Sequence, residues 1–538
     1  MAAIPVLGAS RFEGVFEGAS RAVLEGTALP AFLGRQRWFG GKARPIERVR
    51  VFDGGPLQPP LTPFLVVADV NFADGGAERY ALPLTVLAEP EISVLLKHRP
   101  FAAIAWIDAE GGRLLTDALV DDNACRGLLA AIDARRQFGF IEGSVVSVRD
   151  VPSVVDSPLT DIPVRRSGAE QSNSSIIFGR ASILKIFRRL EPGPHPELEL
   201  GRFLRKVGFP DVPAVLGSME YTTGLESSAL AVLHALVPDS TDGWAHALEH
   251  VGQYYARVGS GPTDLARSLT PPGTLLALPH HDLAPAVREP IGAYLEAAHT
   301  LGHQTAALHL ALARGTDEAL APQPITRDDV RTVVEGTRAR AERALALLAT
   351  RAPLLAGHTA GRAQALLASG PTLFARLDVL AGARLAATKA RCHQDYHLGQ
   401  LLWRGSRYAL LDFEGEPARP LTERRRKRSP LTDVAGMLRS YSYAAWSGLF
   451  AWSRAHHADA LERAPWATLW ETAVTAAFLS SYFADTHGAS FIPADNTQLA
   501  VLLELLMLDK AVYELEYELN NRPDWLPVPL EGLLRLLG

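Results

Sequence analysis

The chain has 538 residues, of which 47% are hydrophobic and 21% are charged, as in ordinary globular proteins. These proportions exclude a chain that is disordered throughout and a collagen-like chain. The 54 Lys and Arg residues nearly balance the 59 Asp and Glu residues. A net charge of −5 gives no support for nucleic acid as the main partner. The length predicts two to four domains of about 150 residues each.

Two cysteines, Cys125 and Cys392, allow at most one disulfide, which predicts a reduced, cytoplasmic protein. The N-terminal segment lacks the basic stretch and long apolar run that are typical of a signal peptide. No stretch reaches the roughly 18 uncharged apolar residues of a membrane span. We therefore expect no membrane association.

The first 90 residues are rich in Gly and Pro, and their apolar runs at 64–70 and 80–86 predict strands. A basic and aromatic cluster at 35–42, Arg-Gln-Arg-Trp-Phe-Gly-Gly-Lys, stands out in this part. The segment 121–135 has apolar residues at a helical spacing. This region therefore mixes strands with at least one helix.

From residue 163 the runs 175–178 and 182–188 predict strands, and a helix is expected from Pro196 to about Val207. Beyond residue 240 the sequence is rich in Ala and Leu, and 297–313 and 326–348 predict helices. The overall expectation is an α+β protein, with a β-rich first part and a helical second part. His303 and His309 are six residues apart, and we interpret both as ordinary helix residues.

The most informative segment is 391–400, Arg-Cys-His-Gln-Asp-Tyr-His-Leu-Gly-Gln. One interpretation is a metallohydrolase, because His393 and His397 would share a helix face and could bind zinc. Against it, Asp395 follows the first His by two positions, where the zincin pattern has a Glu one position on. Gly399 also closes the segment before a long helix could form.

The second interpretation is phosphoryl transfer, because the protein-kinase catalytic loop has an H-x-D motif with Asn five residues further on. Here His393, Asp395 and Gln400 stand at that spacing, with Gln in place of Asn. Asp412 opens a D-F-E turn seventeen positions after Asp395. Asp395 is then expected to take the proton of the acceptor hydroxyl, and Gln400 and Asp412 to hold Mg²⁺ against the ATP phosphates.

A kinase also needs a strand lysine for the phosphates and a helix glutamate that pairs with it. Lys185, in an apolar strand, is the candidate lysine; Glu199 is the preferred partner and Glu197 the alternative. There is no Gly-rich phosphate loop. The equivalent turn predicts phosphate contacts from Gln171, Ser172, Asn173 and Ser174.

Taken together, these motifs resemble those of bacterial maltokinases. The matching segments are 168–178, 183–187 with 190–193, 393–400, 411–420 (Leu-Asp-Phe-Glu-Gly-Glu-Pro-Ala-Arg-Pro) and 424–440. Residues 37–42 resemble the N-terminal cap of that family. The resemblance implies an aminoglycoside-phosphotransferase-like, bilobal protein-kinase-like fold with an N-terminal β-rich cap and a large helical C-terminal lobe. The expected boundaries are 1–90 for the cap, 91–236 for the N-lobe and 237–538 for the helical C-lobe.

The resemblance further implies ATP- and Mg²⁺-dependent phosphorylation of maltose to maltose 1-phosphate. This product would feed α-glucan or glycogen synthesis, and the maltose would come from trehalose through a functional link to trehalose synthase. It places His234 and Leu236 at the end of the strand whose backbone would meet adenine. Asp433 matches a position expected to stabilise the catalytic loop.

Carboxylates, Arg, His and aromatic faces commonly hold sugar hydroxyls, so we expect Tyr396, His397, Glu414 and Arg419 to bind the acceptor. The basic run 424–428 is interpreted as a solvated loop near the substrate cleft. One residue departs from the family: Gln394 stands where the loop usually has Gly. The alternatives are a kinase of another sugar, such as glucosamine, and a non-catalytic pseudokinase that binds ATP.

Overall fold

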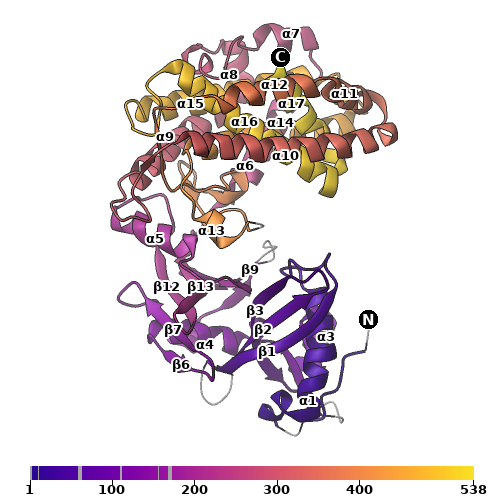
Figure 1. Cartoon of the computed structure of the whole chain (residues 1–538), viewed down its shortest axis with the longest axis vertical. Helices are drawn as coiled ribbons and strands as arrows, with labels where there is room; N and C mark the ends of the chain where they lie inside the picture. Colours follow the sequence, from indigo (N-terminus) through magenta and orange to yellow (C-terminus); the bar gives the residue numbers. More distant parts are fainter. Residues whose placement is uncertain are drawn as a thin grey trace. The chain divides into compact units, whose positions relative to one another are not determined.

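The computed structural model describes residues 3–9, 11–57, 63–108, 112–155, 157–167, 173–417 and 419–538. The chain forms two compact units (Figure 1). The first contains Met1–Arg205, Pro213–Pro238 and Pro417–Leu421. The second contains Lys206–Val212, Asp239–Glu416 and Thr422–Gly538. The first unit holds the sheets and the second holds the long helices, which confirms the α+β class.

A six-stranded antiparallel sheet forms the N-terminal part of the first unit. Its strand order is β1-β2-β3-β5-β4, with β11 paired to β3. The strands are β1 (Ile46–Pro56), β2 (Phe64–Phe72), β3 (Ala77–Leu87), β4 (Ala103–Trp106), β5 (Leu114–Asp117) and β11 (Arg189–Leu190). The two strands expected at 64–70 and 80–86 are therefore present. The sheet does not end at residue 90, because β4 and β5 belong to it.

The second sheet of this unit has seven antiparallel strands in the order β6-β7-β12-β13-β10-β9-β8. They are β6 (Gln137–Gly139), β7 (Ser144–Arg149), β8 (Val164–Arg166), β9 (Asn173–Phe178), β10 (Ser182–Phe187), β12 (Val215–Thr223) and β13 (Glu226–Ala235). Strand β10 carries Lys185 and lies between β9 and β13. This lysine therefore lies on an interior strand of the sheet.

Five helices accompany these sheets: α1 (Gly18–Val23), α2 (Leu29–Arg35), α3 (Glu91–His98), α4 (Asp122–Asp133) and α5 (Pro196–Lys206). Asp121 caps α4, since its carboxylate accepts a hydrogen bond from the backbone N–H of Asn123. The buried face of α4 includes Cys125, Leu129 and Ile132, at the 3.6-residue period expected from the sequence. That face packs into one apolar core with residues of both sheets.

Arg188, directly after β10, connects the two sheets. Its guanidinium donates to the Asp117 carboxylate at 2.7 Å and to the Ser174 hydroxyl at 3.0 Å. The same group lies 4.6 Å from the ring of Trp38. Because Arg188 and Asp117 are both buried, this charge pair fixes the end of the first sheet against the strand that follows the predicted phosphate turn.

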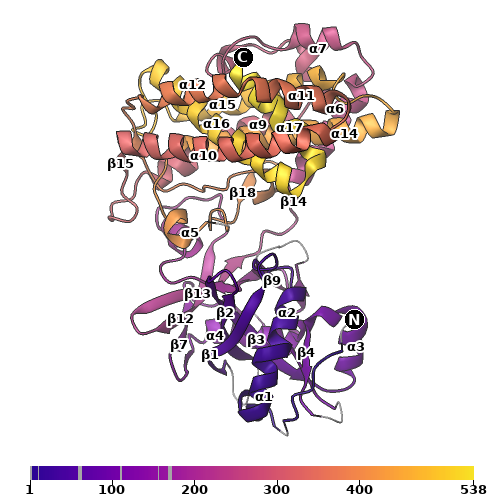
Figure 2. The same ribbon diagram turned by 45° about the vertical axis from the view of Figure 1, so that its right-hand side comes forward.

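The second unit is built mainly from helices, and the longest of them lie side by side (Figure 2). They are α6 (Gly243–Val258), α7 (Thr263–Leu269), α8 (Pro285–Ile291), α9 (Tyr294–Leu312), α10 (Arg327–Arg351), α11 (Gly357–Ala368), α12 (Gly370–Ala381), α13 (Leu421–Arg424), α14 (Leu431–His456), α15 (Ala464–Asp485), α16 (Asn496–Asn521) and α17 (Pro527–Leu537). Thr326 and Asp329 form a capping box at the start of α10. No helix among the described residues has both the length and the apolar character needed to cross a membrane.

Short strands in the second unit frame the segment 391–400. They are β14 (Thr241–Asp242), β15 (Gln323–Pro324), β16 (Thr388–Lys389), β17 (Leu401–Trp403) and β18 (Tyr408–Leu410). β17 pairs with β14 on one side and β18 on the other, and all pairs are antiparallel. The segment therefore leaves β16, passes a loop and enters a small sheet, whose last strand leads directly to Asp412.

The glycine pair 40–41 gives a test of the N-terminal core. A Cβ at Gly41 would lie 2.5 Å from the ring of Phe72, whereas a Cβ at Gly40 would meet nothing within 4 Å. We predict that Gly41→Ala lowers the free energy of unfolding by about 1–3 kcal/mol, because the buried aromatic rings have to shift. Gly40→Ala is the matched control, and we expect a change within about 0.5 kcal/mol. Equal unfolding curves for the two variants would contradict this packing.

Candidate active site

The loop 393–397 is held by a buried carboxylate at the start of α14. The backbone N–H groups of His393 and Gln394 donate to the two oxygens of Asp433, each at 2.8 Å. His309, on α9, lies with its Nε2 3.1 Å from the same carboxylate. The side chains of His309 and Asp433 are fully buried. His309 is thus part of the site's support, and its interpretation as an ordinary helix residue is wrong.

The charge state of Asp433 follows from these contacts. Burial by itself raises the pKa of this carboxyl group, but the hydrogen bond and charge of His309 and the N–H of Gln394 hold the pKa below its usual value. Asp433 is therefore ionised at neutral pH. An ionised carboxylate accepts strong hydrogen bonds, which is what the two loop amides require.

His393 connects this loop to the segment after β18. Its Nε2 lies 2.7 Å from the carbonyl oxygen of Leu411, and since a carbonyl only accepts, Nε2 is the donor. Its Nδ1 accepts from the backbone N–H of Asp395 at 3.4 Å. The imidazole also packs 4.8 Å from the ring of Phe413. One side chain thus fixes the positions of Asp395 and of the residue before Asp412.

Gln394 has the left-handed backbone conformation that glycine adopts most easily, with φ of 68°. The strain of such a conformation is of order 1–3 kcal/mol for a non-glycine residue. Its side chain offsets that strain by donating from Nε2 to the carbonyl oxygens of Arg424 and Arg426, both at 2.9 Å. Its Oε1 accepts from Nε of Arg428 at 3.1 Å. The residue in place of the usual Gly keeps the same turn and adds a link to the segment 424–428.

Asp395, the predicted base, has a side chain that is 23% exposed. Its carboxylate lies 3.8 Å from Nε2 of His397, and Nδ1 of that histidine accepts from the N–H of Gly399. Burial lowers the pKa of His397, and the charge of Asp395 opposes that shift only in part. The two histidines do not share a helix face, because residues 393–397 form a loop. The metallohydrolase interpretation is therefore wrong.

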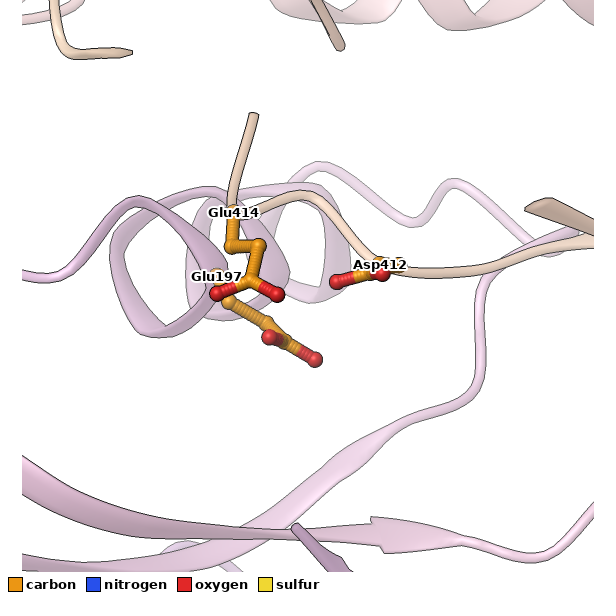
Figure 3. Close-up of side chains that lie close together, drawn as sticks. All are labelled: Glu197, Asp412 and Glu414. Atoms are coloured by element: carbon orange, nitrogen blue, oxygen red, sulfur yellow. The ribbon is translucent and has the colours of Figure 1, made fainter. Parts of the chain in front are cut away.

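Asp412 and Glu414 form a pair of carboxylates after β18 (Figure 3). Their nearest oxygens lie within 4.8 Å of each other. Asp412 has a φ of 62°, a strained conformation typical of functional sites. Paired carboxylate oxygens suit Mg²⁺. Glu414, which we expected at the acceptor, is thus a further candidate ligand of Mg²⁺. The predicted ligand Gln400 lies in the 3₁₀ turn Leu398–Gln400, where its backbone bonds to His397 and Leu411.

In the first unit, Lys185 pairs with Glu197, the alternative that the sequence offered to the preferred Glu199. Nζ of Lys185 lies 2.9 Å from one oxygen of Glu197, and Nε2 of His234 lies 2.9 Å from the other. Burial alone would raise the pKa of Glu197, but Lys185 and His234 hold it well below its usual range. The physical reason is the helix period: positions 197, 200, 201 and 204 form the buried stripe of α5, and Glu199 lies beside it.

The structure describes only some of the residues that we predicted to contact the phosphates and the adenine. Gln171 and Ser172 lie outside the described residues. Asn173 begins β9, and the Ser174 hydroxyl accepts from Arg188. The N–H of Leu236 donates to Ala181, so the backbone group that it could offer to adenine is its carbonyl.

The acceptor prediction for Tyr396 is wrong, because its side chain belongs to the core. Tyr396 is 2% exposed, and its hydroxyl lies 2.9 Å from that of Thr305 on α9. Burial raises the pKa of Tyr396, which keeps the phenol neutral. Arg419 is half-buried in the segment that leads to α13. His397 and Glu414 lie next to Asp395 and Asp412 in the second unit, and with Arg419 they remain the acceptor candidates.

Comparison with known proteins agrees with this arrangement. Residues 32–121 match the maltokinase N-terminal cap domain. The chain is 28% identical over 375 residues to the glucosamine kinase of Streptacidiphilus jiangxiensis, which covers 68% of this chain and 72% of that protein. It is 27% identical over 369 residues to the glucosamine kinase of Mycolicibacterium smegmatis (strain ATCC 700084 / mc(2)155), covering 68% and 78%.

Solved structures give the same fold. A glucosamine kinase in complex with glucosamine, ADP and inorganic phosphate aligns with a TM-score of 0.59 at 23% identity. That alignment covers 95% of this chain and 97% of the other. A second crystal form of glucosamine kinase aligns with a TM-score of 0.61 at 22% identity, over 94% and 97% of the two chains. This chain therefore shares the fold of these glucosamine kinase structures.

The fold and the H-x-D loop agree with a phosphotransferase, and the curated relatives and aligned structures are sugar kinases. The chain is thus similar to maltokinases in its N-terminal cap and to glucosamine kinases over about two thirds of its length. The cap match ends at residue 121, shortly after the last strand of the first sheet at Asp117. The match thus runs past residue 90.

The pairing of Lys185 with Glu197 can be tested by comparing two acidic residues of α5, Glu197 and Glu199. We predict that Glu197→Gln weakens ATP binding and lowers kcat/KM for ATP at least tenfold, because it removes the charge that orients Lys185. Glu199→Gln should change both quantities less than twofold. Calorimetric titration with ATP and initial rates would measure the two effects. The pairing is refuted if Glu199→Gln causes the larger loss.

The carboxylate at position 433 predicts a pH dependence. Its pKa in the folded state lies below that of an unfolded Asp, so its stabilisation is complete above about pH 4 and is lost as the pH falls through the folded-state value. Asp433→Asn should lower the free energy of unfolding by about 2 kcal/mol or more at pH 7 and should reduce the acid sensitivity. Asp524→Asn, at an exposed position, is the control. Unchanged melting curves for Asp433→Asn from pH 3 to 7 would contradict this role.

Proposed function

We propose that this chain is an ATP- and Mg²⁺-dependent kinase that phosphorylates the anomeric hydroxyl of maltose to give maltose 1-phosphate. The observation that carries the proposal is the loop 393–397, clamped by Asp433 in the H-x-D arrangement of kinases. The cap match over residues 32–121 supports maltose as the acceptor. In this proposal the product enters α-glucan synthesis, and a trehalose synthase supplies the maltose.

On the acceptor side, Asp395 accepts the proton of the attacking hydroxyl as its oxygen bonds to the γ-phosphorus. The bond between that phosphorus and the oxygen bridging it to the β-phosphate breaks, and ADP leaves. His397 is neutral because its pKa is lowered, so it can hydrogen-bond a sugar hydroxyl without adding a charge. The bond from His393 to Leu411 holds the Asp395 and Asp412 segments in register.

On the nucleotide side, Lys185 neutralises phosphate charge, and Glu197 keeps its ammonium group oriented. Asp412 and Glu414, with Gln400, offer the oxygen donors that Mg²⁺ prefers. When bound, Mg²⁺ would neutralise the charge on the ATP phosphates. We include Glu414 because its oxygens lie beside those of Asp412.

Glucosamine is the second candidate acceptor, because the two curated relatives and the aligned structures are glucosamine kinases. Glucosamine carries an amino group that is cationic at neutral pH, whereas maltose is neutral and larger. A glucosamine site would need a carboxylate for the amine, and a maltose site would need room for a second ring. The acceptor is thus decided by rates on the two sugars.

A sugar panel tests the proposal. Purified protein with Mg-ATP should release ADP with maltose at a kcat/KM at least tenfold above that with glucosamine, glucose or trehalose. Phosphorus NMR should show the new phosphate ester coupled to the anomeric proton. Turnover of glucosamine with none on maltose would replace the acceptor and keep the kinase. Nucleotide binding without turnover of any sugar would favour the pseudokinase.

The base is tested separately. Asp395→Asn should lower kcat about a hundredfold or more and leave the affinity for ATP within threefold, since the amide cannot take the proton. Asp524→Asn serves again as a control for the loss of one carboxylate. Full activity of Asp395→Asn would remove Asp395 from this role.

A further inference from the structure

A cavity lies within the helical unit, and it is not lined by the residues proposed for phosphoryl transfer in that unit. It encloses about 890 Å³ and is lined by α10, the segment 422–429 and α16. None of Asp395, Gln400 and Asp412 lines it. One wall is apolar and contains Val333, Leu502 and Leu506. The volume exceeds what a single inorganic anion fills, so the cavity suits a small organic molecule.

Another part of the lining, the cationic wall, is strongly basic. Six basic side chains line the cavity: Lys389, Arg391, Arg425, Arg426, Lys427 and Arg428. Three carboxylates also line it, and two of them form ion pairs: Asp329 with Lys389 at 2.6 Å, and Asp509 with Arg340 at 2.8 Å. Arg340 is not a lining residue. The cavity therefore has an excess of positive charge.

The titration of Lys427 shows the same imbalance. Its pKa is lowered, first by burial and then by the charge of Arg391; Glu318 opposes this shift and Lys389 adds to it. Its Nζ donates to the backbone carbonyl of Glu318, which is a neutral partner. Like charges held this close are mutually repulsive, and a bound anion would relieve the repulsion.

The cationic wall is held in place before any ligand binds. Gln394 bonds to the carbonyl oxygens of Arg424 and Arg426, and Arg428 and Ala390 exchange two backbone hydrogen bonds at 2.9 Å. Fixing the backbone in advance reduces the entropy lost on binding. Thr332, Thr422 and Thr432 also line the cavity, and hydroxyl groups can bond to a polyhydroxy ligand.

We infer that this cavity is a binding site for a phosphorylated sugar, with the phosphate held by Arg426 and Lys427 and the sugar ring resting on the apolar wall. The site is separate from the proposed phosphoryl-transfer centre and does not depend on the acceptor. Arginine and lysine are the usual partners of phosphate esters, and sugar rings present apolar faces as well as hydroxyls. Both kinds of group line this cavity.

Calorimetric titration of the full-length protein with glucose 1-phosphate tests the inference. We expect saturable binding to the parent and a loss of affinity of at least tenfold in Arg426→Ala/Lys427→Ala. Arg331→Ala removes one cation from α10 outside the cavity, and it should bind as the parent does. Glucose without phosphate should not bind, and inorganic phosphate should bind at least tenfold more weakly than the sugar phosphate.

A second pair of measurements separates this site from the nucleotide site. Lys185→Met should bind glucose 1-phosphate as the parent does, whatever its activity. The ligand should also slow tryptic cleavage within 424–428, where the basic residues are cut. Binding that is lost in Lys185→Met and kept in Arg426→Ala/Lys427→Ala would overturn the inference, as would equal affinity for inorganic phosphate. A sugar panel without turnover would leave these results unchanged, so the two proposals fail separately.

Discussion

The buried carboxylate of Asp433 is the interaction on which the proposed catalytic centre depends. It accepts the backbone N–H groups of His393 and Gln394, and His309 is its side-chain partner. These bonds hold a left-handed turn that a side chain at 394 would otherwise disfavour. This left-handed conformation sets the direction of Asp395. It also positions His393 to bond to Leu411, the residue before Asp412. The charge of Asp433 therefore positions the loop that carries Asp395, the proposed base.

In the first unit, a buried carboxylate likewise holds residues that we propose for the nucleotide side. Lys185 and His234 lie on the same face of the sheet, because Ile183, two residues before Lys185, pairs with His234 across β10 and β13. Both reach the carboxylate of Glu197. Arg188, three residues after Lys185, in addition contacts the ring of Trp38 in the N-terminal part of the chain. In both units a buried acidic group with several donors fixes the residues that the chemistry needs.

Much of the site was predictable from the sequence because it follows chain order. The spacing of Asp395 and Asp412 reflects a loop, a strand and a returning strand, which the structure contains. Longer-range contacts were not predictable: His309 meets Asp433 across 124 residues. Glu199 was preferred over Glu197 because it lies beside the apolar stripe of α5, and a sequence does not show that Glu197 is buried. Tyr396 was assigned to the acceptor because a sequence does not show which aromatic rings are buried.

The most direct test of this organisation is hydrogen exchange at the amides of His393 and Gln394, compared between the parent and Asp433→Asn. The parent should protect both amides as strongly as the core of α14. The variant should exchange both at least a hundredfold faster, while the amides of β10 around Lys185 keep their rates. Equal protection of the two loop amides in the variant and the parent would contradict the claim that this carboxylate holds the catalytic loop.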